Sequence, residues 1–264
     1  MMNKDIKFIF FGSSRFSGFV LEELEIAGYS PILNIASAKD DLDIDKLRAL
    51  DADLFVVASF GKILTKTILD IPKHGSLNVH PSLLPELRGP APIQNLILGL
   101  GTPGVTIIKM DEKMDHGPIL AQEKVSITPW PDHYDKVEEK MGRAGGKLLL
   151  TPLANIGCWP TTPQDESKAT YIKLIKKEDG LLDLEDDAGT NLRKVLAYST
   201  WPGAYFFFKN KMGKEIRVVV KDAKIKDPKP EQDRHGASGK FVPTRIIPEG
   251  KKEMDWQDFL RGNA

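Results

Sequence analysis

An amide, an imidazole and a carboxylate are the side chains in this sequence most able to do chemistry together. Asn78 and His80 are two residues apart in a run that ends at Pro81, so in a strand both point to the same face. Asp115 follows in the turn 111–117. Acyl transfer to an amine needs a donor for the oxyanion, a group that handles the amine's proton and an acid that orients that group. The three side chains could supply these needs, although Asn78 and His80 taken alone also fit a hydrogen-bonded strand end.

The elements that must position these side chains are strands and helices in alternation. Strands are expected at 6–11, 32–35, 54–60 and 76–80, and helical segments at 19–27, at 44–50 and from Thr65 onward. Strands that are apolar on both faces and separated by helices indicate a parallel sheet in a doubly wound α/β domain. Ligands of such sheets bind beyond the carboxyl ends of the strands, so the segments after Phe11, Phe60 and His80 are the expected site.

Two further strands and a long helix complete the expected first domain. The strands lie at 105–110 and 119–127, joined by the turn that contains Asp115, and the helix lies at 132–150. The proline-containing segment 157–170 then fits a linker between domains.

The second half of the chain shows short strands separated by turns. A helix is expected at 191–199 and strands at 204–208, at 216–220 and within 239–247, which predicts a small β-barrel or sandwich. The length of 264 residues also favours two domains. We therefore expect an α/β domain at 1–160 and a β-barrel domain at 170–264.

The charge is balanced overall but uneven along the chain. The sequence holds 37 Lys+Arg against 37 Asp+Glu, and residues 209–245 hold 11 Lys+Arg against 5 Asp+Glu. This basic stretch could contact phosphates, although the charge alone favours a solvated lysine-rich surface. A single cysteine, Cys158, excludes an internal disulfide and a cysteine-based zinc cluster. No run approaches the roughly 20 apolar residues of a membrane span and no secretory signal pattern is present, which predicts a cytoplasmic protein.

Several motifs, taken in order and with their spacing, resemble the folate-dependent formyltransferase family. They lie at 78–85, 88–94, 104–108 and 110–120, and in the second half at 176–180, 201–205, 248–252 and 258–262. The second-half motifs are similar to the branch of the family that formylates methionyl-tRNA. The resemblance covers nearly the whole chain and implies a Rossmann-like formyltransferase domain followed by an OB-like β-barrel that contacts tRNA.

The resemblance also implies the reagents and the site residues. The donor would be 10-formyltetrahydrofolate, with no metal. Asn78 would bond the formyl oxygen, protonated His80 would stabilise the oxyanion, and Asp115 would hold the imidazolium and pass the amine's proton through water. The folate pocket would be lined by Phe60, Gly61, Lys62, Ile63, Leu64, Ser82, Leu83, Leu84, Pro85, Asp111 and Glu112. The amine would meet Gly12, Ser13, Ser14 and Arg15, where relatives carry a Gly-Thr-Pro-like sequence.

One departure from the family bears on the acceptor. Relatives that act on tRNA have a long basic insertion before the third strand, whereas the connection 36–46 is short and carries four aspartates against two lysines. Such a charge repels phosphate. Because the C-terminal domain is retained, we expect initiator methionyl-tRNA, with a small amine such as glycinamide ribonucleotide or an amino sugar nucleotide as the alternative. The intact set Asn78, His80 and Asp115 opposes a third hypothesis, a non-catalytic folate- or RNA-binding module.

Overall fold

The structure, a computed structural model, describes residues 5–226 and 239–263. The chain divides into two compact units. The first consists of Met1–Pro92, Gly101–Ile127 and Val137–Lys173, and the second of Ile93–Leu100, Thr128–Lys136 and Leu174–Ala264. Among the described residues, no helix has the length and apolar character needed to cross a bilayer.

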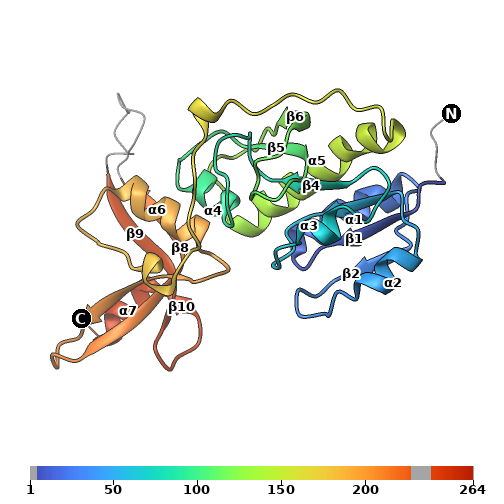
Figure 1. Ribbon diagram of the computed structural model, residues 1–264. Coiled ribbons are helices and arrows are strands. Elements are labelled where there is room, and N and C mark those ends of the chain that lie inside the picture. The colour runs from blue at the N-terminus through green and yellow to red at the C-terminus, as the bar shows by residue number, and fades with distance from the viewer. Residues whose placement is uncertain (1–4, 227–238, 264) are drawn as a thin grey trace. The chain divides into compact units, whose positions relative to one another are not determined.

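A six-stranded sheet forms the core of the first unit (Figure 1). Its strands are β1 (Phe8–Phe11), β2 (Leu33–Ile35), β3 (Leu54–Val57), β4 (Ser76–His80), β5 (Gly104–Lys109) and β6 (Ile119–Lys124). They lie in the order β2-β1-β3-β4-β5-β6. The first four strands are parallel, whereas β5 runs antiparallel to both β4 and β6. The expected mostly parallel α/β sheet is confirmed, and β1 and β3 are buried along their whole length, as a sheet covered on both faces requires.

The first helix begins directly after β1 because two serines cap it. The helices of the first unit are α1 (Arg15–Ile26), α2 (Ile44–Ala49), α3 (Lys66–Leu69) and most of α5 (Tyr134–Ala154), with the 3-10 turn η1 (Glu166–Lys168). Ser14 Oγ accepts a hydrogen bond from Ser17 N at 3.3 Å, and Ser17 Oγ accepts one from Ser14 N at 3.1 Å. This capping box explains why α1 starts four residues before the helix expected at 19–27.

Glycines let α5 approach its neighbours closely. A Cβ atom added at Gly145 would lie 2.6 Å from Val79 Cγ1. One added at Gly146 would lie 2.8 Å from the backbone oxygen of Val20. Side chains of any size would hold these elements apart, so α5 packs directly on β4 and α1. The contact at Val79 supports β4 between Asn78 and His80.

The chain after α5 remains paired with the first unit instead of forming a free linker. Its backbone bridges to β6 between Thr162 and Ile119, and to the loop after β4 between Tyr171 and Arg88. We call the segment 162–172 the strap. Because only isolated residues of the strap pair with the first unit, the sequence of the strap shows no regular apolar pattern. Its composition is therefore that of a linker.

A four-stranded antiparallel sheet forms most of the second unit (Figure 1). The strands are β7 (Ala204–Lys209), β8 (Glu215–Lys226), β9 (Lys240–Pro248) and β10 (Met254–Asp255), in the order β10-β9-β8-β7. The helices are α4 (Pro92–Ile97), α6 (Ala188–Ala197) and α7 (Trp256–Asn263), with the 3-10 turn η2 (Lys177–Gly180). The core contains Leu182, Val195, Ala204, Phe206, Val218, Val220, Ile246 and Phe259. The expected β-rich second domain is confirmed, whereas the sequence patterns do not predict α4 and α7.

Gly146→Ala tests the close packing of α5. The added methyl group would meet the backbone oxygen of Val20, so we expect the free energy of unfolding to fall by about 1–3 kcal/mol. Gly18→Ala is the matched control, because Gly18 is exposed on α1 with no neighbour within 4 Å of the added Cβ. Alanine there should stabilise the protein by about 0.5–1 kcal/mol. Urea denaturation measures both changes, and equal effects of the two substitutions would contradict this packing.

Candidate active site

Asn78 and His80 lie near the carboxyl end of β4, and both side chains reach the carboxylate of Asp115. Asn78 Nδ2 donates to Asp115 Oδ1 at 3.2 Å. His80 Nδ1 lies 3.4 Å from the same oxygen. Alternation along the strand places the two side chains on one face, and the turn between β5 and β6 brings Asp115 to it. The structure thus brings the amide, the imidazole and the carboxylate together.

Both ring nitrogens of His80 face oxygen acceptors. Nδ1 faces Asp115, and Nε2 lies 3.1 Å from the backbone oxygen of Leu87. The side chain of His80 is only 5% exposed, so water does not compete freely for these contacts. A neutral imidazole donates from one nitrogen only, whereas an imidazolium donates from both. A neutral ring can therefore donate to only one of these two acceptors, whereas a protonated ring can donate to both.

The carboxylate of Asp115 is buried and surrounded by donors. Its side chain is 10% exposed, and Oδ2 accepts a hydrogen bond of 2.9 Å from Gly89 N. Burial by itself raises the pKa of Asp115, but the charge and hydrogen bond of His80, the N–H of Gly89 and the charge of Arg88 outweigh it and lower the pKa below its ordinary value. Asp115 is therefore ionised at neutral pH.

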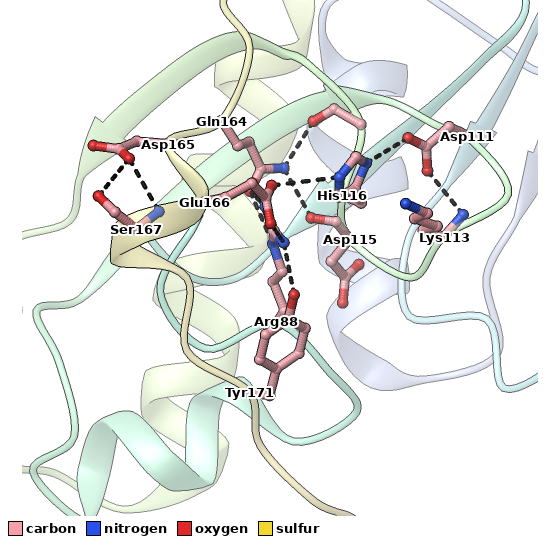
Figure 2. Close-up of polar contacts among 11 residues, drawn as sticks. Arg88, Asp111, Lys113, Asp115, His116, Gln164, Asp165, Glu166, Ser167 and Tyr171 are labelled. Carbon is pink, nitrogen blue, oxygen red and sulfur yellow. Dashed lines mark hydrogen bonds and ion pairs between the residues drawn. The ribbon is translucent and has the colours of Figure 1, made fainter.

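The loop 111–117 holds Asp115 in a backbone conformation that few residues adopt. Asp115 has a φ of 54°, in the left-handed region. Gly117 leaves no room for a side chain, because a Cβ there would lie 1.8 Å from Lys109 O. Gln164 of the strap donates from Nε2 to Asp115 O at 2.8 Å and to Gly117 O at 2.7 Å (Figure 2). Sequence reasoning misses Gln164, because a single glutamine in an irregular segment carries no spacing signal.

The first group of expected folate-lining residues, 60–64, follows β3. Phe60 is half-buried and packs its ring 5.5 Å from that of Phe11, measured between centroids. Leu64 is buried, whereas Ile63 is 78% exposed. The segment therefore carries one apolar side chain that is free to meet a ligand, beside others that anchor the loop.

The second group, 82–85, is held largely by its own buried contacts. Ser82 Oγ donates to a backbone oxygen four residues farther on at 2.6 Å, and Leu84 N donates to Thr106 Oγ1 at 3.1 Å. The side chains of Ser82 and Leu84 are buried, and those of Leu83 and Pro85 are half-buried. Leu83 and Pro85 are thus the members of this group that a ligand can reach.

The third group consists of Asp111 and Glu112, which are both exposed. The carboxylate of Asp111 binds His116 Nδ1 at 2.8 Å and accepts from Lys113 N at 2.9 Å (Figure 2). These bonds stabilise the turn that carries Asp115, so part of the hydrogen-bonding capacity of Asp111 is used within the protein.

The residues expected to meet the amine form the connection from β1 to α1, namely Gly12, Ser13, Ser14 and Arg15. Ser13 Oγ donates to Ser59 O at 3.3 Å and accepts from Gly61 N at 3.2 Å. On the other side, Lys62 Nζ donates to Asp40 O at 3.0 Å. The expected amine site, the segment 60–64 and the acidic connection 36–46 are therefore neighbours.

Other candidate sites are separate from this cluster. No group of three or more His, Cys, Asp or Glu side chains suited to a metal ion occurs within the described ranges 5–226 and 239–263. A hollow of about 710 Å³ lies in the second unit, and its lining includes none of the residues expected in the active site.

Comparison with protein families assigns both halves of the chain. Residues 22–153 match the formyl transferase family and residues 174–264 match the formyl transferase C-terminal domain. The chain therefore belongs to the formyl transferase family, whose members move formyl groups between molecules. Among curated relatives, the methionyl-tRNA formyltransferase of Bacillus licheniformis is 38% identical over 245 residues, which cover 88% of this chain and 77% of that protein.

Solved structures share the fold across both units. Methionyl-tRNA formyltransferase from Clostridium thermocellum superposes with a TM-score of 0.69 at 16% identity, covering 95% of this chain and 99% of that one. HypX from Aquifex aeolicus in complex with tetrahydrofolic acid gives a TM-score of 0.71 at 19% identity, covering 97% of this chain and 47% of that one. At these identities the likeness establishes the fold.

Asp115→Asn tests the electrostatic role of the buried carboxylate. A carboxyl group with a lowered folded-state pKa contributes stability above its ordinary value of 3.8 and loses it as the pH falls through the lowered pKa. We therefore expect the wild-type protein to be more stable than the variant at about pH 6 and the difference to shrink toward about pH 3. Denaturant unfolding at several pH values measures it. Asp41→Asn, at an exposed position, is the control, and a difference that grew with acidity would contradict the assignment.

Proposed function

We propose that this protein transfers the formyl group of 10-formyltetrahydrofolate to the amino group of initiator methionyl-tRNA. The observation that carries the proposal is the meeting of Asn78, His80 and Asp115 within hydrogen-bonding or ion-pair distance, in a chain of the formyl transferase family. The name of the Bacillus licheniformis relative, which matches over most of its length, supports methionyl-tRNA as the acceptor.

In this proposal Asn78 and His80 stabilise the oxyanion that forms when the amine attacks the formyl carbon. Asn78 carries two hydrogens on Nδ2, of which one binds Asp115 and the second can donate to the formyl oxygen. His80 contributes the positive charge of its imidazolium at short range. Because the amide dipole and the imidazolium charge act in a site shielded from water, they are stronger than they would be in solvent.

Asp115 manages the proton in the same step. The new bond joins the amine nitrogen to the formyl carbon, and the bond from that carbon to N10 of the folate breaks. The ammonium proton passes through a water molecule to Asp115 and then to N10, so that tetrahydrofolate leaves with N10 neutral. The ionised state of Asp115 at neutral pH fits a proton acceptor in this role.

The folate would lie against the segments 60–64 and 82–85, with Asp111 and Glu112 at the edge. Pockets for small ligands combine apolar walls with a few polar groups. Exposed Ile63 and half-buried Phe60 provide apolar surface beyond the end of β3, at the edge of the sheet where ligands of this fold class bind. The apolar surface supports this position for the flat ring of a pterin.

The second unit offers a basic and aromatic surface for the nucleic acid. The guanidinium of Arg217 lies 4.0 Å from the centroid of the Tyr205 ring. Arg217 pairs across the strands with Phe207, which is 53% exposed. Lys209 is also exposed at the end of β7. Positive charge beside exposed rings is typical of surfaces that bind single-stranded ends of nucleic acids.

A small amine remains the second candidate because of the acidic connection 36–46. Asp43 in this connection caps α2, accepting from Asp45 N at 3.0 Å and from Lys46 N at 3.1 Å. The connection touches the segment 60–64 through Lys62. Negative charge so near the expected site disfavours a polyanion and favours a compact acceptor.

Release of tetrahydrofolate, measured with methionyl-tRNA and with glycinamide ribonucleotide in parallel, decides between the two acceptors. Transfer to neither would contradict the proposed reaction.

His80→Ala should remove most of the stabilisation of the oxyanion. We expect turnover to fall by about 100- to 1,000-fold, because removing one preorganised electrostatic contribution to the oxyanion typically costs about that much. Binding of the folate donor should change little, since the charge that His80 meets develops only in the transition state. His74→Ala is the matched control in the same unit and should keep near wild-type turnover. Steady-state kinetics with folate titrations test this, and equal losses in turnover and folate affinity would show that the role is misassigned.

Charge reversal on the second unit should weaken tRNA binding. We expect the variant carrying Lys209→Glu, Lys211→Glu and Arg217→Glu to bind tRNA less tightly. Its slope of log affinity against log salt should be smaller by up to about 3, about 1 for each phosphate that the protein no longer neutralises. Lys147→Glu, an exposed substitution in the first unit, is the control. Filter binding across a salt series measures the slopes, and binding that does not respond to salt would favour the small amine.

A further inference from the structure

Gln164 uses every hydrogen-bonding group of its side chain inside the first unit. Its Nε2 donates to the backbone oxygens of Asp115 and Gly117, at 2.8 and 2.7 Å. Its Oε1 accepts from Arg88 Nε at 3.1 Å and from Arg88 Nη2 at 2.8 Å. Figure 2 shows Gln164 between Arg88 on one side and the loop of Asp115 on the other.

Arg88 is a buried cation that fixes the strap next to this glutamine. Its side chain is 1% exposed and makes a bidentate pair with Glu166, with Nη2 at 2.7 Å and Nη1 at 3.0 Å from the two carboxylate oxygens. Nη1 also donates to the hydroxyl of Tyr171 at 2.9 Å. The hydrogen bond with Glu166 raises the pKa of Arg88 above its ordinary value, against the opposing effect of burial. A bidentate arginine pair fixes direction as well as distance.

Gly89 and Gln164 hold Asp115 from two sides, and Arg88 lies next to both. The residue after Arg88, Gly89, donates its backbone N–H to Asp115 Oδ2. The side chain of Arg88 orients Gln164, which in turn holds the backbone oxygen of Asp115. Gly89 therefore fixes the carboxylate of Asp115, and Gln164, oriented by Arg88, fixes its main chain.

We infer that Gln164 is a positioning residue for Asp115, acting through the loop 111–117 and held in place by Arg88. The inference rests on the proposed function, since it concerns the aspartate assigned to the proton transfer. Asp115 sits in the left-handed region, which non-glycine residues leave unless their surroundings hold them there. The two bonds from Gln164 Nε2 supply that restraint. A displacement of about 1 Å at a reacting group can cost about 100-fold in rate.

Gln164→Glu is the sharpest test because it replaces one nitrogen by oxygen. The carboxylate keeps an oxygen that accepts from Arg88. The NH2 group that donates to the backbone oxygens of Asp115 and Gly117 is replaced by a second oxygen, which cannot donate and is repelled by both. We expect kcat for formyl transfer to fall by about 10- to 100-fold, with KM for the folate donor within about twofold. Arg143→Lys is the matched control: Arg143 also binds carboxylates of the first unit, Glu23 and Glu139, and kcat should not change. An unchanged kcat in Gln164→Glu, or an equal loss in the control, would overturn the inference.

A second measurement does not need activity and separates this inference from the proposed function. The amide of Gly89 is protected by its bond to Asp115 Oδ2, so its hydrogen exchange should quicken by about tenfold or more in Gln164→Glu and stay unchanged in Arg143→Lys. If the wild-type protein transfers no formyl group while Gly89 exchange quickens, the proposed function fails and the positioning role stands. If transfer occurs but Gly89 exchange is the same in Gln164→Glu and wild type, the positioning role fails and the function stands.

Discussion

A buried negative charge on Asp115 is the constraint around which the first unit is arranged. An ionised carboxylate in a site that is 10% exposed costs free energy unless donors and a positive charge compensate it. Asn78, His80 and Gly89 supply them, from the strand β4 and from the loop that follows it. The exclusion of water that makes this charge costly also strengthens its interactions with neighbouring groups. Where water is excluded, the carboxylate faces Nδ1 of the imidazole and fixes the orientation of the ring.

The other elements of the first unit hold those donors in place. β4 lies inside the sheet, paired with β3 and β5, and α5 packs against Val79 through a glycine, so the strand that carries Asn78 and His80 cannot shift. The loop after it is less regular and needs other support. The strap supplies that support through backbone bridges, and through the side chains of Gln164 and Glu166 that meet Arg88.

The parts of the site that the sequence predicts are those with a periodic signal. Alternation places Asn78 and His80 on one face of β4, and the glycine and aspartate of the turn 111–117 mark a tight connection between two strands. Pairing across the sheet then brings the turn to that face. The strap cannot be predicted in the same way. Its two bridges and its side-chain hydrogen bonds involve single residues, such as Gln164, whose partners are distant in sequence and leave no pattern in the local composition. The helices α4 and α7 escape prediction because they are short; α4 begins at Pro92, and α7 follows β10 with no residue between them.

Protonation of His80 tests the central claim most directly, because a carboxylate and a carbonyl on opposite sides of one ring are satisfied only by an imidazolium. Nitrogen-15 NMR of histidine-labelled protein at neutral pH reports whether each ring nitrogen carries a hydrogen, with the signals of His80 assigned from a His80→Gln variant. The account predicts hydrogens on both nitrogens in the wild-type protein and a changed Nδ1 signal in Asp115→Asn. An unprotonated Nδ1 in the wild-type protein, or one that does not respond to Asp115→Asn, would contradict it.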